Sequence, residues 1–184
     1  MAVHDIVIVG ASFAGLSTAH YLLRHTIPKL EASNSGQTYK LTLVSTTERF
    51  LFKVGTPRTI AAPNLIPAEK VLLPIADAFK NYSADHFRLV IGTACGVDNQ
   101  KKTVSVSGGG GSTAISYATL VIATGSRTSS PLWTLQDDYR ETDAELKKIH
   151  IALQKASTVL VAGGGPAGVE TAGIFPPHHL SFPS

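Results

Sequence analysis

The chain has 184 residues, of which 43% are hydrophobic and 16% are charged, with a formal net charge of +3 at pH 7. Average globular proteins carry about 25% charged residues, so this composition predicts a folded chain with much buried surface and excludes a disordered one. The charge is only mildly basic and no run of Lys and Arg exceeds two residues, which argues against a nucleic-acid partner. The single cysteine, Cys95, excludes an intrachain disulfide or a Cys-x-x-Cys redox pair within these residues.

No apolar stretch approaches the roughly 20 residues of a membrane span, so we expect no transmembrane segment. The N-terminal sequence MAVHDIVIVG lacks a basic segment and has the pattern of a strand from about Asp5, which leaves no room for a targeting presequence. We therefore expect a cytoplasmic protein. No side chain is assigned a catalytic role, and no metal site is expected.

A glycine turn follows the first strand of the sequence. The run IVIV that ends at Val9 is typical of a strand covered on both faces, and it leads through GASFAG into a helical pattern that we expect to end before Pro28. Gly10 allows a tight turn, a small residue at Ser12 lets backbone N–H groups approach a pyrophosphate, and Gly15 lets the helix pack closely. The turn therefore predicts a dinucleotide site.

Two alternatives stay open for this turn. The sequence GASFA nearly matches the G-x-S-x-G nucleophile elbow of hydrolases, although it follows the first strand and lacks the last glycine. A strand–helix turn without a ligand is the second alternative. Ser12 also stands where the dinucleotide pattern usually has its middle glycine; its Cβ narrows the approach, but its hydroxyl can donate to a phosphate.

The second strand is predicted over 39–44. A dinucleotide fold usually ends this strand with an acidic residue that accepts the ribose hydroxyls. This sequence has Ser45 there, which can make one weaker hydrogen bond, and Glu48 follows in the loop.

The middle of the chain predicts short elements. We expect a helix around 58–62, strands over 87–91 and 103–106, and a further buried strand over 116–123. The sequence SGGGGS from Ser107 is predicted to be a hairpin tip, because no helix pattern follows it that could hold an anion.

A helix is expected after this region, beginning at a capping box from Thr142 to Glu145. A second strand, glycine turn and helix then follow from Thr158, in the sequence TVLVAGGGPAGVETAG. Gly163 stands too close to Ser184 for a complete βαβ unit, which needs about 30 residues or more.

The last residues change in character. Pro176 and Pro177 are expected to end the helix, and the adjacent His178 and His179 lack partner ligands for a metal. We therefore predict a disordered tail over 174–184, and we form the hypothesis that the chain is the truncated front portion of a longer protein.

Three segments carry a resemblance to a known family: IVIVGASFAGL, LVIATGS and VLVAGGGPAGVETAG. Their order resembles that of the pyridine nucleotide-disulfide oxidoreductase superfamily, flavoproteins in which FAD occupies one dinucleotide fold and NAD(P)H a second fold inserted into it. The segments FLFKVGTPRTIAAP, PIADAF and TVSV are similar, more narrowly, to apoptosis-inducing-factor-like and ferroptosis-suppressor-like oxidoreductases. The resemblance covers 4–173.

The resemblance implies two sets of cofactor-binding residues. It assigns to FAD the residues Gly10, Ala11, Ser12, Phe13, Ala14, Gly15, Arg58, Ala94, Thr124 and Gly125. It assigns to NAD(P)H the residues Gly163, Gly165, Gly168 and Glu170. It also places Lys53 near the flavin. Alternatives remain for three of these residues: Arg58 as a solvated loop arginine, Lys53 as an exposed lysine, and Glu170 as a helix glutamate stabilised by the helix dipole.

The implied reaction passes hydride from NAD(P)H to FAD, and electrons then pass to a small acceptor such as a quinone. The fold class is α/β, with a Rossmann-like FAD-binding domain over 1–157 that is incomplete at its C-terminal end. We expect this domain to have a parallel sheet with helices on both faces and a β-rich excursion around 86–107. The first βα of an NAD(P)-binding domain follows over 158–173. The alternative function is a non-catalytic nucleotide-binding fragment or a regulatory stub, so whether the chain is itself an enzyme stays open.

Overall fold

The chain folds into two compact units. The computed structural model describes residues 2–34, 36–135 and 137–175. The first unit comprises Met1–Glu48 and Pro74–Ser126, and the second comprises Arg49–Leu73 and Arg127–Ser184. The predicted tail, with its prolines and histidines at 176–179, lies outside the described residues apart from its first two positions.

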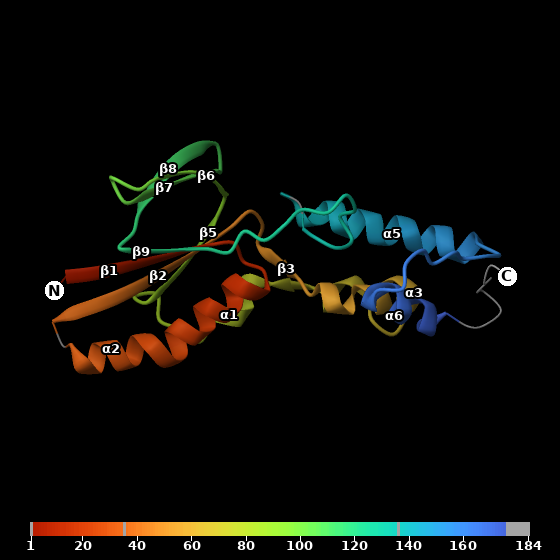
Figure 1. The fold of residues 1–184 in the computed structure, drawn as a ribbon, viewed down its shortest axis with the longest axis horizontal. Helices are drawn as coiled ribbons and strands as arrows, with labels where there is room; N and C mark the ends of the chain where they lie inside the picture. The colour runs from red at the N-terminus through yellow and green to blue at the C-terminus, as the bar shows by residue number, and fades with distance from the viewer. Residues whose placement is uncertain (1, 35, 136, 176–184) are drawn as a thin grey trace. The chain divides into compact units, whose positions relative to one another are not determined.

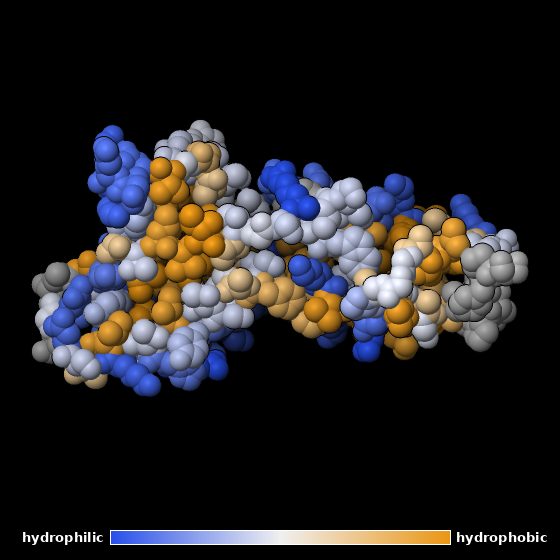
Figure 2. Space-filling model, in the orientation of Figure 1, coloured by the Kyte–Doolittle hydropathy of each residue, from blue (hydrophilic) through white to orange (hydrophobic). Residues whose placement is uncertain are grey.

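A four-stranded parallel sheet forms the centre of the first unit (Figure 1). Its strand order is β5-β2-β1-β9, with the bounds β1 Ala2–Val9, β2 Gln37–Ser45, β5 Phe87–Ile91 and β9 Thr119–Ile122. All three pairings are parallel, which confirms the predicted α/β fold class and the predicted strands. β9 forms one edge of this sheet: Ile122 is 68% exposed, and Figure 2 shows apolar side chains gathered over this part of the unit.

One face of this sheet is covered by a nearly continuous helical segment (Figure 1). It consists of α1 (Phe13–Tyr21), a π-helical turn (Leu22–Thr26) and α2 (Ile27–Ser33). The expectation that the helix ends before Pro28 is wrong. Pro28 lies in the first turn of α2, directly after the π-helical turn, and the helical path continues through it.

The other face is covered by strands, so the expectation of helices on both faces is wrong for the described part of this unit. The strands β6 (Thr93–Asp98), β7 (Thr103–Gly108) and β8 (Gly111–Ser116) form an antiparallel sheet. Alternate residues of β7 point inward, so that Val104 and Val106 pack with Val7, Val9 and Val44 in one core cluster. The β-rich excursion therefore extends beyond the predicted 86–107 to Ser116.

The glycine run of this excursion is a hairpin tip, as the sequence predicts. Gly108 pairs with Gly111, and the two residues between them, Gly109 and Gly110, have φ of +59° and +89°. Two positive φ values in a two-residue loop match the strand twist and favour glycine strongly.

The second unit is built from short elements around its own core. It contains β3 (Arg49–Leu51), paired with β4 (Leu72–Pro74), the 3₁₀ turns Lys53–Gly55 and Ala68–Lys70, and the helices α3 (Thr56–Ala61), α5 (Tyr139–Lys155) and α6 (Pro166–Ile174). Six buried apolar residues form the core cluster: Leu51, Ile60, Val71, Leu72, Leu132 and Leu146. Among the described residues, we find no helix with the length and apolar character needed to cross a membrane.

The start of α5 differs from the prediction. The helix begins at Tyr139, and the Asp138 side chain caps it by accepting a hydrogen bond from the Arg140 N–H at 2.9 Å. The predicted capping box at Thr142 is therefore wrong. Thr142 is fully buried within the helix and its hydroxyl donates to the carbonyl oxygen of Pro131 at 2.8 Å, which ties the helix to the preceding loop.

A histidine links α1 to the residues that follow α4 (Ile75–Phe79) in the first unit. The His20 ring stacks on Phe79 with centroids 4.3 Å apart, and its Nδ1 lies 3.0 Å from the Tyr82 hydroxyl. Burial, and then the nearby charge of Arg24, lower the pKa of His20 from its usual 6.5. The folded chain therefore favours neutral His20.

We expect the free energy of unfolding to decrease as the pH falls from 6.5 through the lowered pKa of His20. In that interval the unfolded chain binds more protons than the folded one, so protonation drives unfolding. Urea titrations at several pH values measure this slope, and His20→Gln should make it shallower. A slope that His20→Gln leaves unchanged would contradict this assignment.

Candidate nucleotide-binding site

The first glycine turn is held at the carboxyl end of the parallel sheet. β1 ends at Val9, whose carbonyl oxygen accepts a hydrogen bond from the Ala123 N–H at 2.8 Å. The Gly10 N–H donates to the carbonyl oxygen of Val44 at 2.9 Å. The turn is therefore fixed to both neighbouring strands as it leaves the sheet.

Only glycine fits at the first position of this turn. Gly10 has φ +106°, a region that L-residues rarely adopt. A Cβ at Gly10 would also overlap the carbonyl group of Ala123 and lie 3.0 Å from the Thr124 nitrogen. The chain after β9 thus passes directly against the turn.

Gly15 performs the second structural role that the sequence predicts. It is buried in the first turns of α1, and a Cβ there would collide with the carbonyl oxygen of Gly10. The helix can approach the end of the strand this closely only because both residues are glycines. This close approach directs the N-terminus of α1 to the space beyond the sheet.

The N-terminus of α1 has the features of an anion site. Ser12 is its N-cap, with an extended backbone, and its hydroxyl makes no capping hydrogen bond. No acidic residue lies in the first turn, and residues 12–14 are exposed. Because a helix begins with N–H groups that have no partner within the helix, this end carries partial positive charge. The turn thus fits a diphosphate group, and the Ser12 hydroxyl is available as a further donor.

Ser45 does not have the role that the sequence suggested for it. Its side chain is buried, and its hydroxyl donates to the carbonyl oxygen of Thr47 at 2.6 Å. The same oxygen lies 3.4 Å from the Thr47 N–H. Because this side chain is buried and its only hydrogen is donated within the loop, Ser45 is not placed to bind a ribose. Glu48 is exposed and its carboxylate accepts from the Thr47 hydroxyl at 3.4 Å.

The other residues assigned to FAD in the first unit lie on β6 and after β9. Ala94 is half-buried, and its side chain packs against the core cluster of valines, so its backbone is the part that can address a ligand. Thr124 and Gly125 are exposed, and Gly125 has φ +70°. Of the assigned residues, the structure brings Gly10, Gly15 and Thr124 to one place.

Two assigned cations belong to the second unit. Arg58 lies in α3 and Lys53 in the 3₁₀ turn before it, and both are exposed. Within the described part of the chain, neither takes part in an ion pair. Both are therefore available to an anionic ligand.

The second unit contains a second glycine turn with the same backbone geometry. Gly163 has φ +115°. A Cβ at Gly168 would collide with the carbonyl oxygen of Gly163, just as a Cβ at Gly15 would collide with the carbonyl oxygen of Gly10. Gly165 is the N-cap of α6, Pro166 lies in its first turn, and Glu170 is exposed on the helix. The same backbone arrangement thus occurs twice, with the paired glycines five positions apart in both cases.

Sequence reasoning missed Ala123, whose carbonyl group closes the first turn. Nothing in its local sequence indicates this role, because the contact joins residues more than one hundred positions apart. Only the pairing of β1 with β9 reveals it.

Comparison with known proteins agrees with this geometry. The pyridine nucleotide-disulphide oxidoreductase family matches residues 4–179. The chain belongs to this family. It is 38% identical to oxidoreductase phnG of Penicillium herquei over 92% of its length, and 42% identical to oxidoreductase ptaL of Pestalotiopsis fici over 91%. These matches cover 40% and 44% of the relatives, so the chain spans less than half of their length.

More distant proteins share the fold. Ferroptosis suppressor protein 1 of Mus musculus is 28% identical over 93% of the chain and 40% of its own length. NDH2 from Plasmodium falciparum in complex with NADH superposes with a TM-score of 0.65, at 20% identity over 93% of this chain and 36% of that one. The sulfide:quinone oxidoreductase from Aquifex aeolicus gives a TM-score of 0.61, at 19% identity over 92% and 38%.

We expect Gly10→Ala to lower the free energy of unfolding by about 2–4 kcal/mol. The φ of +106° is unfavourable for alanine, and the new Cβ would also collide with the backbone of Ala123. Urea denaturation followed by circular dichroism measures the loss. Gly96→Ala is the matched control: it lies in the same unit, with open space around it and no positive φ, and should change stability by less than about 0.5 kcal/mol. Equal losses in the two variants would contradict the proposed geometry of the turn.

Proposed function

We propose that this chain binds FAD at its first glycine turn and NAD(P)H at its second, as part of an oxidoreductase of the apoptosis-inducing-factor-like and ferroptosis-suppressor-like type. The observation that carries the proposal is the first turn, where Gly10 and Gly15 bring an uncapped helix N-terminus against the end of a parallel strand. A diphosphate is the ligand that such a turn suits best.

The residues at the first turn each have a part in this binding. The backbone N–H groups of Ala11, Phe13 and Ala14 and the hydroxyl of Ser12 would hold the diphosphate. Thr124 and Gly125, which follow the strand that touches Gly10, would line the cofactor. The exposed guanidinium of Arg58 suits bidentate pairing with a phosphate, and the Ala94 backbone would address the adenine. FAD, when bound, supplies the redox chemistry, and these residues bind and orient it.

The second turn would hold the nicotinamide nucleotide. Gly163, Gly165 and Gly168 repeat the geometry of the first turn, and the N-terminus of α6 has no acidic residue in its first turn. Glu170 would accept a hydrogen bond from the nicotinamide amide. We propose accordingly that 1–157 contribute to an FAD-binding domain and that 158–173 begin an NAD(P)-binding domain.

A small diffusible molecule such as a quinone is the proposed electron acceptor. Cys95 is the single cysteine of the chain and lies exposed on β6, so these residues contain no dithiol that could accept electrons. The name of one similar protein, the sulfide:quinone oxidoreductase, supports this class of acceptor.

We expect Ser12→Asp to weaken FAD binding at least about tenfold, because a carboxylate at the N-cap would repel the diphosphate. The same change should not lower stability, because Asp is a favourable N-cap. Flavin fluorescence quenching measures the affinity, and urea denaturation measures the stability. Ser12→Asn is the matched control, since it has the same shape without the charge, and should bind FAD within a fewfold of the unaltered chain.

Equal affinities for Ser12→Asp and Ser12→Asn would contradict the proposed diphosphate site. A chain that binds FAD but shows no loss of visible flavin absorbance when NADH is added would support FAD binding. The same result would overturn hydride transfer by this chain alone.

A further inference from the structure

The inner face of the central sheet changes character along its strands. At the carboxyl ends it is apolar, with Val7 and its neighbours packed in the core cluster. Further toward the amino ends, on the same face, four residues are charged or polar: Asp5, Lys40, Thr42 and Arg88. Asp5 is in register with Lys40 on β2, and Thr42 is in register with Arg88 on β5. Since residues in register point to the same face, these four side chains share it.

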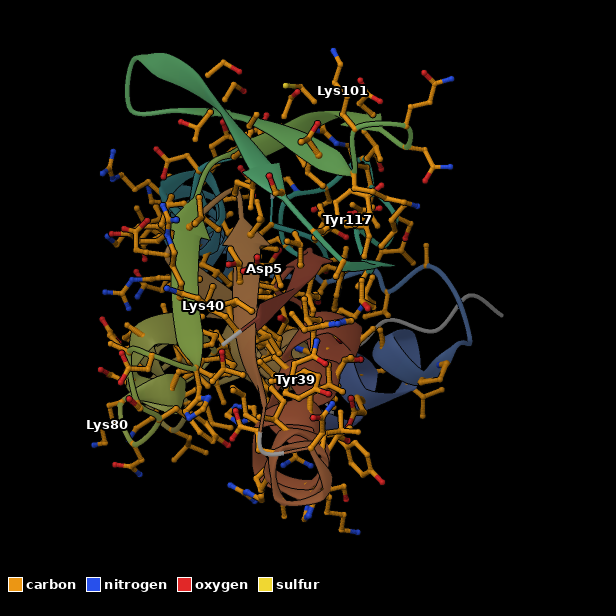
Figure 3. The ribbon with its side chains drawn as sticks, turned by 90° about the vertical axis from the view of Figure 1, so that its left-hand side faces the viewer. Asp5, Tyr39, Lys40, Lys80, Lys101 and Tyr117 are labelled. Atoms are coloured by element: carbon orange, nitrogen blue, oxygen red, sulfur yellow. The ribbon has the colours of Figure 1, made fainter. Side chains whose placement is uncertain are left out.

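A pocket lies over this charged end of the sheet, within the first unit. Its floor consists of the four residues above, and β8 forms its wall with Thr113, Ala114, Ile115 and Ser116. Its volume is ≈ 230 Å³. Figure 3 looks onto this end of the sheet and shows Asp5 and Lys40 on neighbouring strands. The pocket is thus lined by charged groups and hydroxyl groups.

The charges in this pocket do not cancel. Lys40 and Arg88 contribute two cations and Asp5 one carboxylate, and none of the three forms an ion pair with any described residue. Asp5 and Lys40 are half-buried and Arg88 is exposed, so a ligand that enters from solvent can reach all three charges. The pocket therefore attracts an anion.

This site is distinct from the glycine turn. The turn follows the carboxyl end of β1, whereas the pocket lies over Asp5 in the middle of the same strand. Gly10 follows Asp5 by five positions, which corresponds to about 16 Å along an extended strand. A ligand in the pocket would leave the first turn free.

We propose that this pocket binds hydrogen phosphate. The Arg88 guanidinium and the Lys40 ammonium donate to the phosphate oxygens. The hydroxyl of Thr113, which shares the inner face of β8 with Ile115, is a further donor. The carboxylate of Asp5 accepts the hydrogen of the remaining P–O–H group. An acceptor at this position is unfavourable to any oxyanion that has lost all of its protons, so it selects phosphate over sulfate.

The volume of the pocket agrees with a small ligand. It is below the roughly 300–1,000 Å³ of pockets for drug-sized molecules. A water molecule occupies about 30 Å³, so the space holds a tetrahedral oxyanion together with several waters. The site does not have room for a dinucleotide.

Titration of the ¹⁵N-labelled full chain with inorganic phosphate, at constant ionic strength, tests this proposal. We expect saturable shifts of the amide resonances at 113–116, and binding of sulfate that is at least about tenfold weaker. Lys40→Gln and Arg88→Gln should each weaken phosphate binding at least about tenfold, while Arg88→Lys should retain part of it. Lys80→Gln is the matched control, because it removes one exposed charge of this unit outside the pocket (Figure 3) and should have no effect.

Asp5→Asn supplies the decisive comparison. The amide has lost the negative charge, so this variant should bind sulfate as well as it binds phosphate. Shifts that do not saturate, equal effects of Lys80→Gln and Lys40→Gln, or equal binding of sulfate and phosphate by the unaltered chain would each overturn the proposal and leave a solvated set of surface charges.

Discussion

The contact between the first glycine turn and the neighbouring strand is the constraint on which the first unit depends. Gly10 lies against the carbonyl group of Ala123, and Gly15 lies against the carbonyl oxygen of Gly10. Any side chain larger than hydrogen at either position would separate β1 from β9 or α1 from the sheet. Because both positions are glycine, the helix N-terminus reaches the end of the parallel strands, where its N–H groups can meet a ligand.

The same close approach of a helix glycine to a turn glycine occurs again at Gly163 and Gly168, but the surroundings of this second turn differ. At the first turn the missing Cβ makes room for another strand, whereas at Gly163 no atom of the described residues lies within 4 Å of the corresponding position. The first turn is therefore required by the packing of its own sheet as well as by any ligand. In the second turn the positive φ of Gly163 and the close approach of Gly168 are the features that require glycine.

Local sequence patterns predicted the strands and both glycine turns because a strand followed by glycines and a helix is determined by neighbouring residues. Features set by distant contacts could not be predicted in this way. The strands that cover the inner face, the commitment of the Ser45 hydroxyl to Thr47 and the contact of Thr142 with Pro131 all depend on how the loops fold back. The residues of the charged pocket likewise come from four strands, and only their register brings them together.

A crystal structure of this chain with ADP bound would test the central claim most directly, because ADP contains the adenine and diphosphate without the flavin. The account predicts the diphosphate within hydrogen-bonding distance of the backbone N–H groups at 11–15, with Gly10 still against Ala123. A nucleotide bound elsewhere while this turn stays free, or a turn that opens away from β9 to admit it, would contradict the account.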